Sequence, residues 1–186
     1  MCSSDLSPGV PGRGRVGAER VVGGEAEPAR LLDLIGPDGL VYVADTGNSR
    51  VQVFEQDGDF VREWGSYGSA GDQFAFPLGL AVAEDGKVYV ADSRNDRVKV
   101  FSSTGSLLFE FGEGAGGSSQ NGRLDTPNDV AIGPSGDVVV ADTDNHQVHQ
   151  FTADGTFVRR WGGTTVYSPV GVAVGPSGDV YVVDAT

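Results

Sequence analysis

One short stretch recurs along the chain. Residues 41–54 read Val-Tyr-Val-Ala-Asp-Thr-Gly-Asn-Ser-Arg-Val-Gln-Val-Phe, residues 88–101 and 138–151 restate the pattern, and residues 180–184 begin it again. Self-similarity at a fixed period indicates a repeat architecture, in which each copy is one small structural unit packed against its neighbours. The chain therefore has to build its core from stacked copies of one unit.

The spacings within the copies are fixed, and only one connection varies. The Asp that ends the Val-rich run precedes an aromatic-Gly pair by the same interval in every complete copy, and the interval from the preceding Pro to this Asp is also constant. The aromatic residues are Trp64, Phe111 and Trp161, the Pro residues are Pro77, Pro127 and Pro169, and the connections between them, at 65–76, 112–126 and 162–168, differ in length. Length variation confined to one loop indicates an array whose variable loops share one end.

Each complete unit is predicted to contain four β-strands, which in the second copy cover about residues 79–83, 87–91, 97–101 and 107–111. The second strand is apolar on both faces, whereas the third alternates Val98 and Val100 with Lys99. The outer strands of the sheet are therefore expected to be more exposed to solvent than the inner ones. Pro and Gly within residues 36–39, 133–136 and 175–178 predict tight turns between the first two strands. The aromatic residue that ends the fourth strand should pack between neighbouring sheets.

The turn between the second and third strands carries an Asp-x-x-Asn element, for which we expect a structural role. Its members are Asp45 and Asn48, Asp92 and Asn95, and Asp142 and Asn145. An Asp carboxylate accepts backbone N–H groups in a turn and Asn tolerates a left-handed conformation, so the pair could close the hairpin unaided. Arg50 and Arg97 could each pair with the Asp of their own turn. Asp142-Thr-Asp144-Asn145 resembles the opening of a calcium loop, but the Gly and the Glu of such a loop are absent.

The second copy contains the motif Phe74-x-x-Pro77-x-Gly79, the run from Val88 to Asp92, Asn95-x-Arg97 and the closing Phe111-Gly112. Together these motifs resemble the NHL repeat. The resemblance covers essentially residues 30–186 and implies an all-β chain, a β-propeller of four-stranded blades in a ring that is usually six-bladed. The expected blades are residues 30–65, 74–112 and 124–162, with a partial blade at 166–186.

About three and a third blades are fewer than the roughly four to eight that close a propeller, so the chain is expected to be a fragment of a longer ring. Open blade edges would expose apolar surface and invite self-association. Residues 1–28 precede the propeller region at 29–186, are rich in Gly, Pro, Ser and Arg, and are expected to be disordered. Residues 2–6 match a translated sequencing-adapter tail, which makes an artefactual origin of this segment a hypothesis.

Charge and composition limit the classes of partner that the chain can bind. The net charge is -13 with 39% hydrophobic residues, and an acidic surface disfavours nucleic acid and anionic membranes. Neither a signal peptide nor a membrane-spanning run is visible, and one cysteine, Cys2, leaves the cellular compartment unassigned. Neither a cofactor nor a metal site is expected. His146 and His149 are expected to be exposed and, three residues apart on a strand, to point to opposite faces.

Strand order decides which loops share a face. In an up-and-down blade the loop between strands two and three lies beside the inter-blade link, and the other two hairpins lie opposite. The opposite face is acidic and is interpreted as a solvated surface, whereas the face with the links mixes both charges and has the longest connection. Because functional residues concentrate on such loops, the expected binding residues are Arg94, Asn95, Arg123, Asp144 and His146.

Three functions follow from the resemblance. NHL propellers often serve as recognition domains, so a non-catalytic module that binds a protein or peptide is the first. A propeller enzyme with a metal in its central channel, similar to the peptide α-amidating lyase or to a lactonase-like hydrolase, is the alternative. Leu78, Asn128 and Val170 follow the repeated Pro where zinc-binding His residues would be expected, which argues against the lyase. Single-stranded RNA binding needs a basic face with stacking aromatics, and the acidic balance disfavours it.

Overall fold

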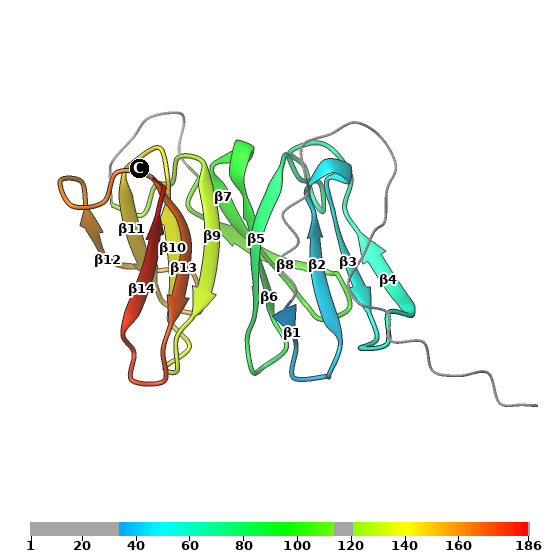
Figure 1. Cartoon of the computed structure of the whole chain (residues 1–186). Helices are drawn as coiled ribbons and strands as arrows, with labels where there is room; N and C mark the ends of the chain where they lie inside the picture. Colours follow the sequence, from blue (N-terminus) through cyan, green and yellow to red (C-terminus); the bar gives the residue numbers. More distant parts are fainter. Residues whose placement is uncertain (1–33, 114–120, 186) are drawn as a thin grey trace, which may run out of the picture.

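The computed structural model describes residues 34–113 and 121–185. This part of the chain forms three four-stranded antiparallel sheets and one two-stranded sheet, and strands that follow one another in sequence are neighbours in each sheet. Figure 1 shows the first sheet at the right, the second in the middle and the third at the left, where β13 and β14 overlap it in this view. The predicted all-β architecture of propeller blades is confirmed. The expected disorder of residues 1–28 lies outside the described residues, and the blade boundaries stay predictions.

The strands have the following bounds. The first blade comprises β1 (Leu34–Ile35), β2 (Val41–Asp45), β3 (Arg50–Phe54) and β4 (Phe60–Trp64), and the second comprises β5 (Pro77–Val82), β6 (Val88–Asp92), β7 (Arg97–Phe101) and β8 (Leu107–Phe111). The third blade comprises β9 (Pro127–Ile132), β10 (Val138–Asp142), β11 (Gln147–Phe151) and β12 (Phe157–Gly162), and the fourth comprises β13 (Pro169–Val174) and β14 (Val180–Asp184). Two 3-10 turns, η1 (Thr46–Asn48) and η2 (Ser93–Asn95), join strands two and three of the first two blades.

The register of strands one and two explains the constant spacing from Pro to Asp. Pro77 pairs with Asp92, Pro127 with Asp142, and Pro169 with Asp184, so the two residues stand opposite each other at the same end of each hairpin. A tight turn closes the other end, as Gly39 N–H donating to Gly36 O at 2.9 Å shows in the first blade. Any insertion between Pro and Asp would shift this register and turn side chains to the wrong face of the sheet.

The core lies between neighbouring blades. Tyr42, Val51 and Val53 of the first blade pack with Val88 and Val90 of the second, all essentially fully buried, and a matching cluster joins the second and third blades. The Trp64 ring centroid lies 5.8 Å from that of Phe101, and the Phe111 centroid lies 4.7 Å from that of Phe151. The prediction that these fourth-strand aromatics pack between sheets is confirmed for both. Trp161 is only half-buried and lies 5.3 Å from the guanidinium carbon of Arg159.

Strand three of the second blade is not the more solvent-exposed strand that its alternation of Val and polar residues predicted. Every residue of β7 is buried, and the Lys99 side chain is fully buried. Its Nζ donates to the carbonyl oxygens of Gly71 at 2.6 Å and Gln73 at 2.7 Å. The reason is that residues 65–76, which connect the first blade to the second, fold back over this strand. Burial lowers the pKa of the Lys99 ammonium, and the two carbonyls replace the water it loses.

Candidate functional site

The two ends of the blades form two different surfaces. We call the first the link face. It consists of the inter-blade links (65–76, 112–126 and 163–168, apart from the undescribed 114–120) and the turns between strands two and three. We call the second the hairpin face. It consists of the turns between strands one and two and between strands three and four. The C-terminal end of β14, at the top of Figure 1, marks the link face, and the turns at the bottom belong to the hairpin face.

On the link face, the repeated Asp binds the link that enters its own blade. Asp92 Oδ1 accepts the N–H of Ala75 at 2.7 Å, Asp142 Oδ1 accepts that of Asp125 at 2.7 Å, and Asp184 Oδ1 accepts that of Ser168 at 2.7 Å. Each donor lies one or two residues before the repeated Pro. In the second and third blades one carboxylate oxygen thus leaves the turn that it was expected to close and holds a segment distant in sequence, and Asp184 holds the link of the fourth blade in the same way.

The second carboxylate oxygen stabilises the turn itself. Asp92 Oδ2 accepts Asn95 Nδ2 at 2.8 Å and Arg97 Nε at 3.0 Å, so the predicted pairing of Arg97 with its own turn is confirmed. Arg50 likewise donates from Nε to Asp45 Oδ2 at 2.7 Å. The left-handed residue of the turn is the one after Asn, with φ of 55° at Ser49, 56° at Asp96 and 56° at His146. Asn was expected at that conformation, but its side chain is instead held by the Asp.

The five expected binding residues all lie on the link face, at two separate junctions. In the second blade, Arg94 is exposed and its guanidinium carbon lies 3.6 Å from the Phe76 ring centroid, whereas Asn95 is half-buried and also donates to Gly68 O at 3.0 Å. Arg123, Asp144 and His146 lie at the third blade. Asp144 accepts Thr126 Oγ1 at 2.7 Å, and His146 Nδ1 is paired with Tyr167 O. Asn95 therefore serves the turn, and Arg94 is presented to solvent.

Exposed aromatic side chains on the links were not singled out from the sequence. Tyr67 is 74% exposed, Tyr167 is 56% exposed and Phe76 is 38% exposed. Aromatic residues and Arg are the side chains most enriched at protein interfaces, where they bury a large area at low entropic cost. Tyr67, Phe76 and Tyr167 all lie on links of variable length, and this shared location was the signal in the sequence that could have identified them.

His149 is buried rather than exposed, with its ring beside those of Phe151 and Phe157. Its Nε2 lies 3.3 Å from Asp142 Oδ2, both side chains are fully inaccessible, and Nδ1 has no hydrogen-bond partner among the described residues. Burial lowers the pKa of His149 to about 4, and burial raises the pKa of Asp142 to about 7. The imidazole is therefore neutral at neutral pH. The residue occupies the same strand position as Lys99 and Gln52, so a polar side chain recurs there in all three blades.

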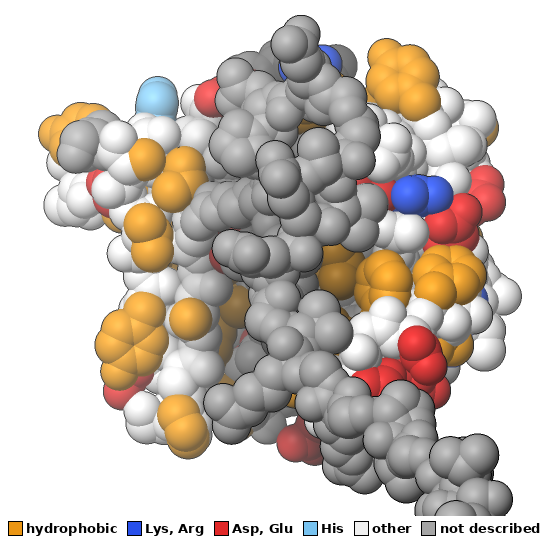
Figure 2. Space-filling view, turned by 45° about the vertical axis from the view of Figure 1, so that its right-hand side comes forward, with side chains coloured by type: hydrophobic (Ala, Val, Ile, Leu, Met, Phe, Trp, Pro, Cys, Tyr) orange, Lys and Arg blue, Asp and Glu red, His pale blue; other side chains and the backbone are white. Residues whose placement is uncertain are grey.

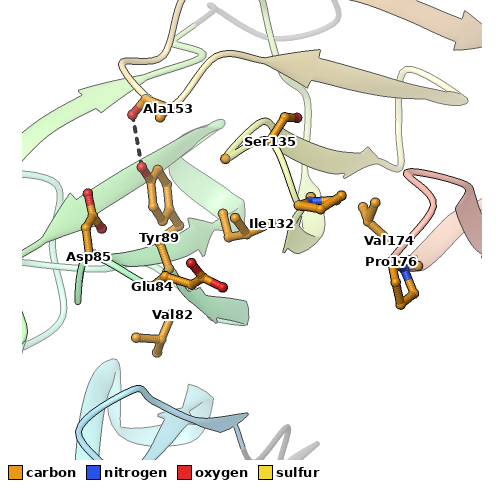
Figure 3. Close-up of a pocket in the computed structure, with 14 residues that line it drawn as sticks. Val82, Glu84, Asp85, Tyr89, Ile132, Ser135, Ala153, Val174 and Pro176 are labelled. Atoms are coloured by element: carbon orange, nitrogen blue, oxygen red, sulfur yellow. Dashed lines mark hydrogen bonds between the residues drawn. The ribbon is translucent and has the colours of Figure 1, made fainter.

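A cavity opens on the hairpin face. It measures about 540 Å³, and turns of the second, third and fourth blades line it, with Tyr89 and Ala153 on one wall. Figure 3 shows Glu84, Tyr89 and Ile132 around this space, with Val174 and Pro176 across from them. A second groove of about 320 Å³ runs along the inner strands β5, β9 and β13 and shares Val82, Ile132 and Val174 with the first.

Within residues 34–113 and 121–185, no three His, Cys, Asp or Glu side chains converge as metal ligands would. The same part of the chain has no helix that is long and apolar enough to cross a membrane.

Comparisons with known proteins agree with this architecture. The family model for the NHL repeat matches residues 33–54, 74–101 and 124–151. RING finger protein nhl-1 of Caenorhabditis elegans is 46% identical over 46 residues, which are 25% of this chain and 5% of that protein.

Solved structures share the fold at low identity. Virginiamycin B lyase from Staphylococcus aureus superposes with a TM-score of 0.65 at 15% identity, over 86% of this chain and 50% of that one. Kuenenia stuttgartiensis hydrazine synthase gives a TM-score of 0.65 at 20% identity, over 83% of this chain and 41% of that one. The chain thus spans about half the length of these structures or less. The three repeat matches and the successive four-stranded sheets identify the chain as an NHL-repeat β-propeller protein.

Proposed function

We propose that the chain is a binding module that recognises a protein or peptide through its link face. The observation that carries this proposal is the set of exposed aromatic rings on the links, Tyr67, Phe76 and Tyr167, with the Arg94 guanidinium stacked on Phe76. Side chains of these types supply most of the binding energy in protein interfaces. NHL-repeat propellers often mediate protein interactions, which supports the same function.

The rigidity of the links supports the proposal further. Their ends are held by Asp carboxylates, and Lys99 binds two carbonyl groups of the first link. Aromatic side chains on a pre-ordered backbone lose less conformational entropy on binding than those on a mobile loop. The link face thus combines large contact area with a backbone that is already ordered.

The experiment is a peptide library selected against the chain, followed by affinity measurements on single variants. Tyr67→Ala, Tyr167→Ala and Arg94→Ala should each weaken the selected peptides by about tenfold or more, the effect expected of an interface anchor. Phe60→Ala is the matched control, because Phe60 is 56% exposed on β4, away from the links. Peptides that bind all three link-face variants as well as the wild type would contradict the proposal.

The other functions gain less support from this site. Similarity to a lyase at 15% identity concerns the fold, and no metal-ligand cluster occurs among the described residues. For RNA, the aromatic rings of the link face would serve for stacking, but the net charge of -13 opposes phosphate binding.

We also infer that copies of the chain self-associate through the fourth blade. Tyr181 and Val183 on β14 are 63% and 58% exposed, an unusual display for a Val-rich strand. Figure 2 shows hydrophobic side chains at several places on the surface of this view, with acidic ones towards its left and right edges as well as in its lower part. An exposed apolar edge strand is a template for pairing with another chain. Sedimentation velocity should show a concentration-dependent oligomer that Val183→Lys weakens, and a wild-type monomer at every concentration would refute the inference.

A further inference from the structure

The cavity on the hairpin face has a distinctive construction. Three turns meet around it, residues 83–86, 133–136 and 175–178, each from a different blade. In each turn the last Gly donates its N–H to the first residue's carbonyl at 2.9 Å. The turns are therefore closed by their own backbone, and these amides are not available to a bound anion.

The walls of the cavity are mostly apolar. Val82, Ile132 and Val174, one from the end of each inner strand, contribute aliphatic surface, and these residues also line the neighbouring groove. Tyr89 contributes the face of its ring, and its hydroxyl donates to Ala153 O at 2.9 Å, as Figure 3 shows. That hydrogen bond uses the one donor of the Tyr89 side chain, which is itself almost fully buried.

Glu84 is the one acidic residue in or directly after these turns whose carboxylate has no partner among the described residues. Asp85 pairs with Lys87, Asp137 Oδ2 accepts Gln150 Nε2 at 2.8 Å, and Asp179 accepts the hydroxyl of Ser177. By contrast, the exposed Glu84 side chain makes no hydrogen bond or ion pair with any described residue. Figure 3 shows it extending from the second blade towards Ile132. A negative charge at the rim of an aliphatic cavity is thus left without a partner.

We propose that this cavity binds a Lys or Arg side chain of an extended basic peptide. The aliphatic stem would pack against Val82, Ile132 and Val174, and the cationic end would meet the Glu84 carboxylate. Lys and Arg combine an apolar stem with a charged head, which matches this arrangement of apolar floor and charged rim. The net charge of -13 attracts a basic ligand and repels an acidic one. The site lies on the opposite face from the proposed peptide-binding links and does not depend on them.

The test uses three synthetic pentapeptides, acetyl-Gly-Leu-X-Leu-Gly-amide, in which X is Lys, norleucine or Glu. Norleucine has the Lys stem without the charge, so the comparison isolates the ion pair. The Lys peptide should bind about three- to fivefold more tightly than the norleucine peptide at low salt, the effect expected of a partly exposed ion pair, and the Glu peptide should bind most weakly. Amide NMR shifts of Gly133, Gly136 and Gly175, which line the cavity, report where each peptide binds.

Two variants decide the outcome. Glu84→Gln should abolish the preference for Lys over norleucine, whereas Glu55→Gln, an exposed acid of the same face outside the cavity, should preserve it. Ile132→Ala should weaken the Lys and norleucine peptides equally, because it removes stem contacts only. Equal binding of Lys and norleucine, a Lys preference that survives Glu84→Gln, or shifts confined to glycines outside the cavity such as Gly58 would overturn the proposal. None of these measurements involves the link-face variants, so the two proposals can fail separately.

Discussion

The carboxylate of Asp92 accepts the backbone N–H of Ala75 at 2.7 Å. The last residue of strand two thus holds the end of the link that leads into strand one of the same blade. Asp92 is fully buried and also binds Asn95 and Arg97. A buried carboxylate is stable only when its oxygens are hydrogen-bonded, and here three donors do so. The Asp residue thus ties together a turn, a neighbouring strand and an inter-blade link.

Replacing Asp92 should be costly. Asp92→Ala removes the acceptor for Ala75 N–H and leaves the Arg97 guanidinium, whose side chain is 7% exposed, without its buried partner. We expect the free energy of unfolding to fall by about 3 kcal/mol, the usual cost of breaking a buried pair. Urea denaturation measures this change.

Asp45→Ala is the matched control, because Asp45 makes the same turn with Arg50 where the two side chains are 15% and 30% exposed. We expect a loss of about 1 kcal/mol there, since exposed ion pairs contribute little. Equal losses in the two variants would show that burial of the Asp92 site does not determine its contribution.

Replacing the buried Trp64 should lower the free energy of unfolding more than replacing the half-buried Trp161. Trp64 is 8% exposed and packs against Phe101 of the next blade, so Trp64→Ala should lower the free energy of unfolding by about 3–5 kcal/mol. Trp161 is half-buried, and we expect Trp161→Ala to cost less than half as much. Chemical denaturation followed by circular dichroism would measure both, and a larger loss at Trp161 would contradict this account of the inter-blade core.

Lys99 should control the order of the first link. Lys99→Met keeps the buried stem but leaves Gly71 O and Gln73 O without their donor, which should cost about 1–3 kcal/mol. Hydrogen exchange should accelerate at the Gln73 amide, which donates to Ala70 O within the link. Gln52→Met changes the corresponding, half-exposed position of the first blade and should leave that exchange rate unchanged. Unchanged exchange in Lys99→Met would mean that the link is ordered by other contacts.

The His149–Asp142 pair predicts an unusual dependence of stability on pH. The pKa of His149, about 4, lies below its ordinary 6.5, so its contribution to stability is present above pH 6.5 and lost as pH falls towards 4. The pKa of Asp142, about 7, lies above its ordinary 3.8, so its contribution is present at low pH and lost as pH rises through 7. Between about pH 4 and 6.5 the two effects oppose each other.

His149→Gln removes only the first effect. Relative to wild type, the free energy of unfolding of this variant should fall as pH rises between about 4 and 6.5, by up to about 1.4 kcal/mol per pH unit. Urea denaturation across this range measures the difference, and parallel profiles for His149→Gln and wild type would refute the assignment of the neutral imidazole.

Sequence reasoning recovered the repeating framework because that framework is encoded locally. Period, turn residues and the spacing of Pro77 to Asp92 reflect strand register, which any copy of the repeat reveals alone. The predicted third and fourth strands of the second blade, residues 97–101 and 107–111, coincide with the observed β7 and β8.

Contacts made by the links could not be predicted in the same way. Lys99 lies between Val98 and Val100, and alternation alone places it in solvent. It is buried because a link without periodicity covers it, and the path of that link depends on tertiary contacts rather than on local pattern. His149 is buried beside Asp142 and Phe157, contacts that the pattern along its own strand does not show. For the same reason the cavity beside Glu84 was not foreseen, since it exists only where turns of three blades meet.

The position of the hydrogen bond between each link and its Asp determines which changes in link length the chain can tolerate. The donor lies one or two positions before the Pro, in the short connection at 162–168 as in the longer ones, so this anchor does not depend on the length of the connection. Residues added upstream of the anchor would leave strand register unchanged, and loop closure costs only about 0.6 kcal/mol per doubling of length. The strand framework can therefore be kept while the links that we propose to bind a partner change in length and sequence.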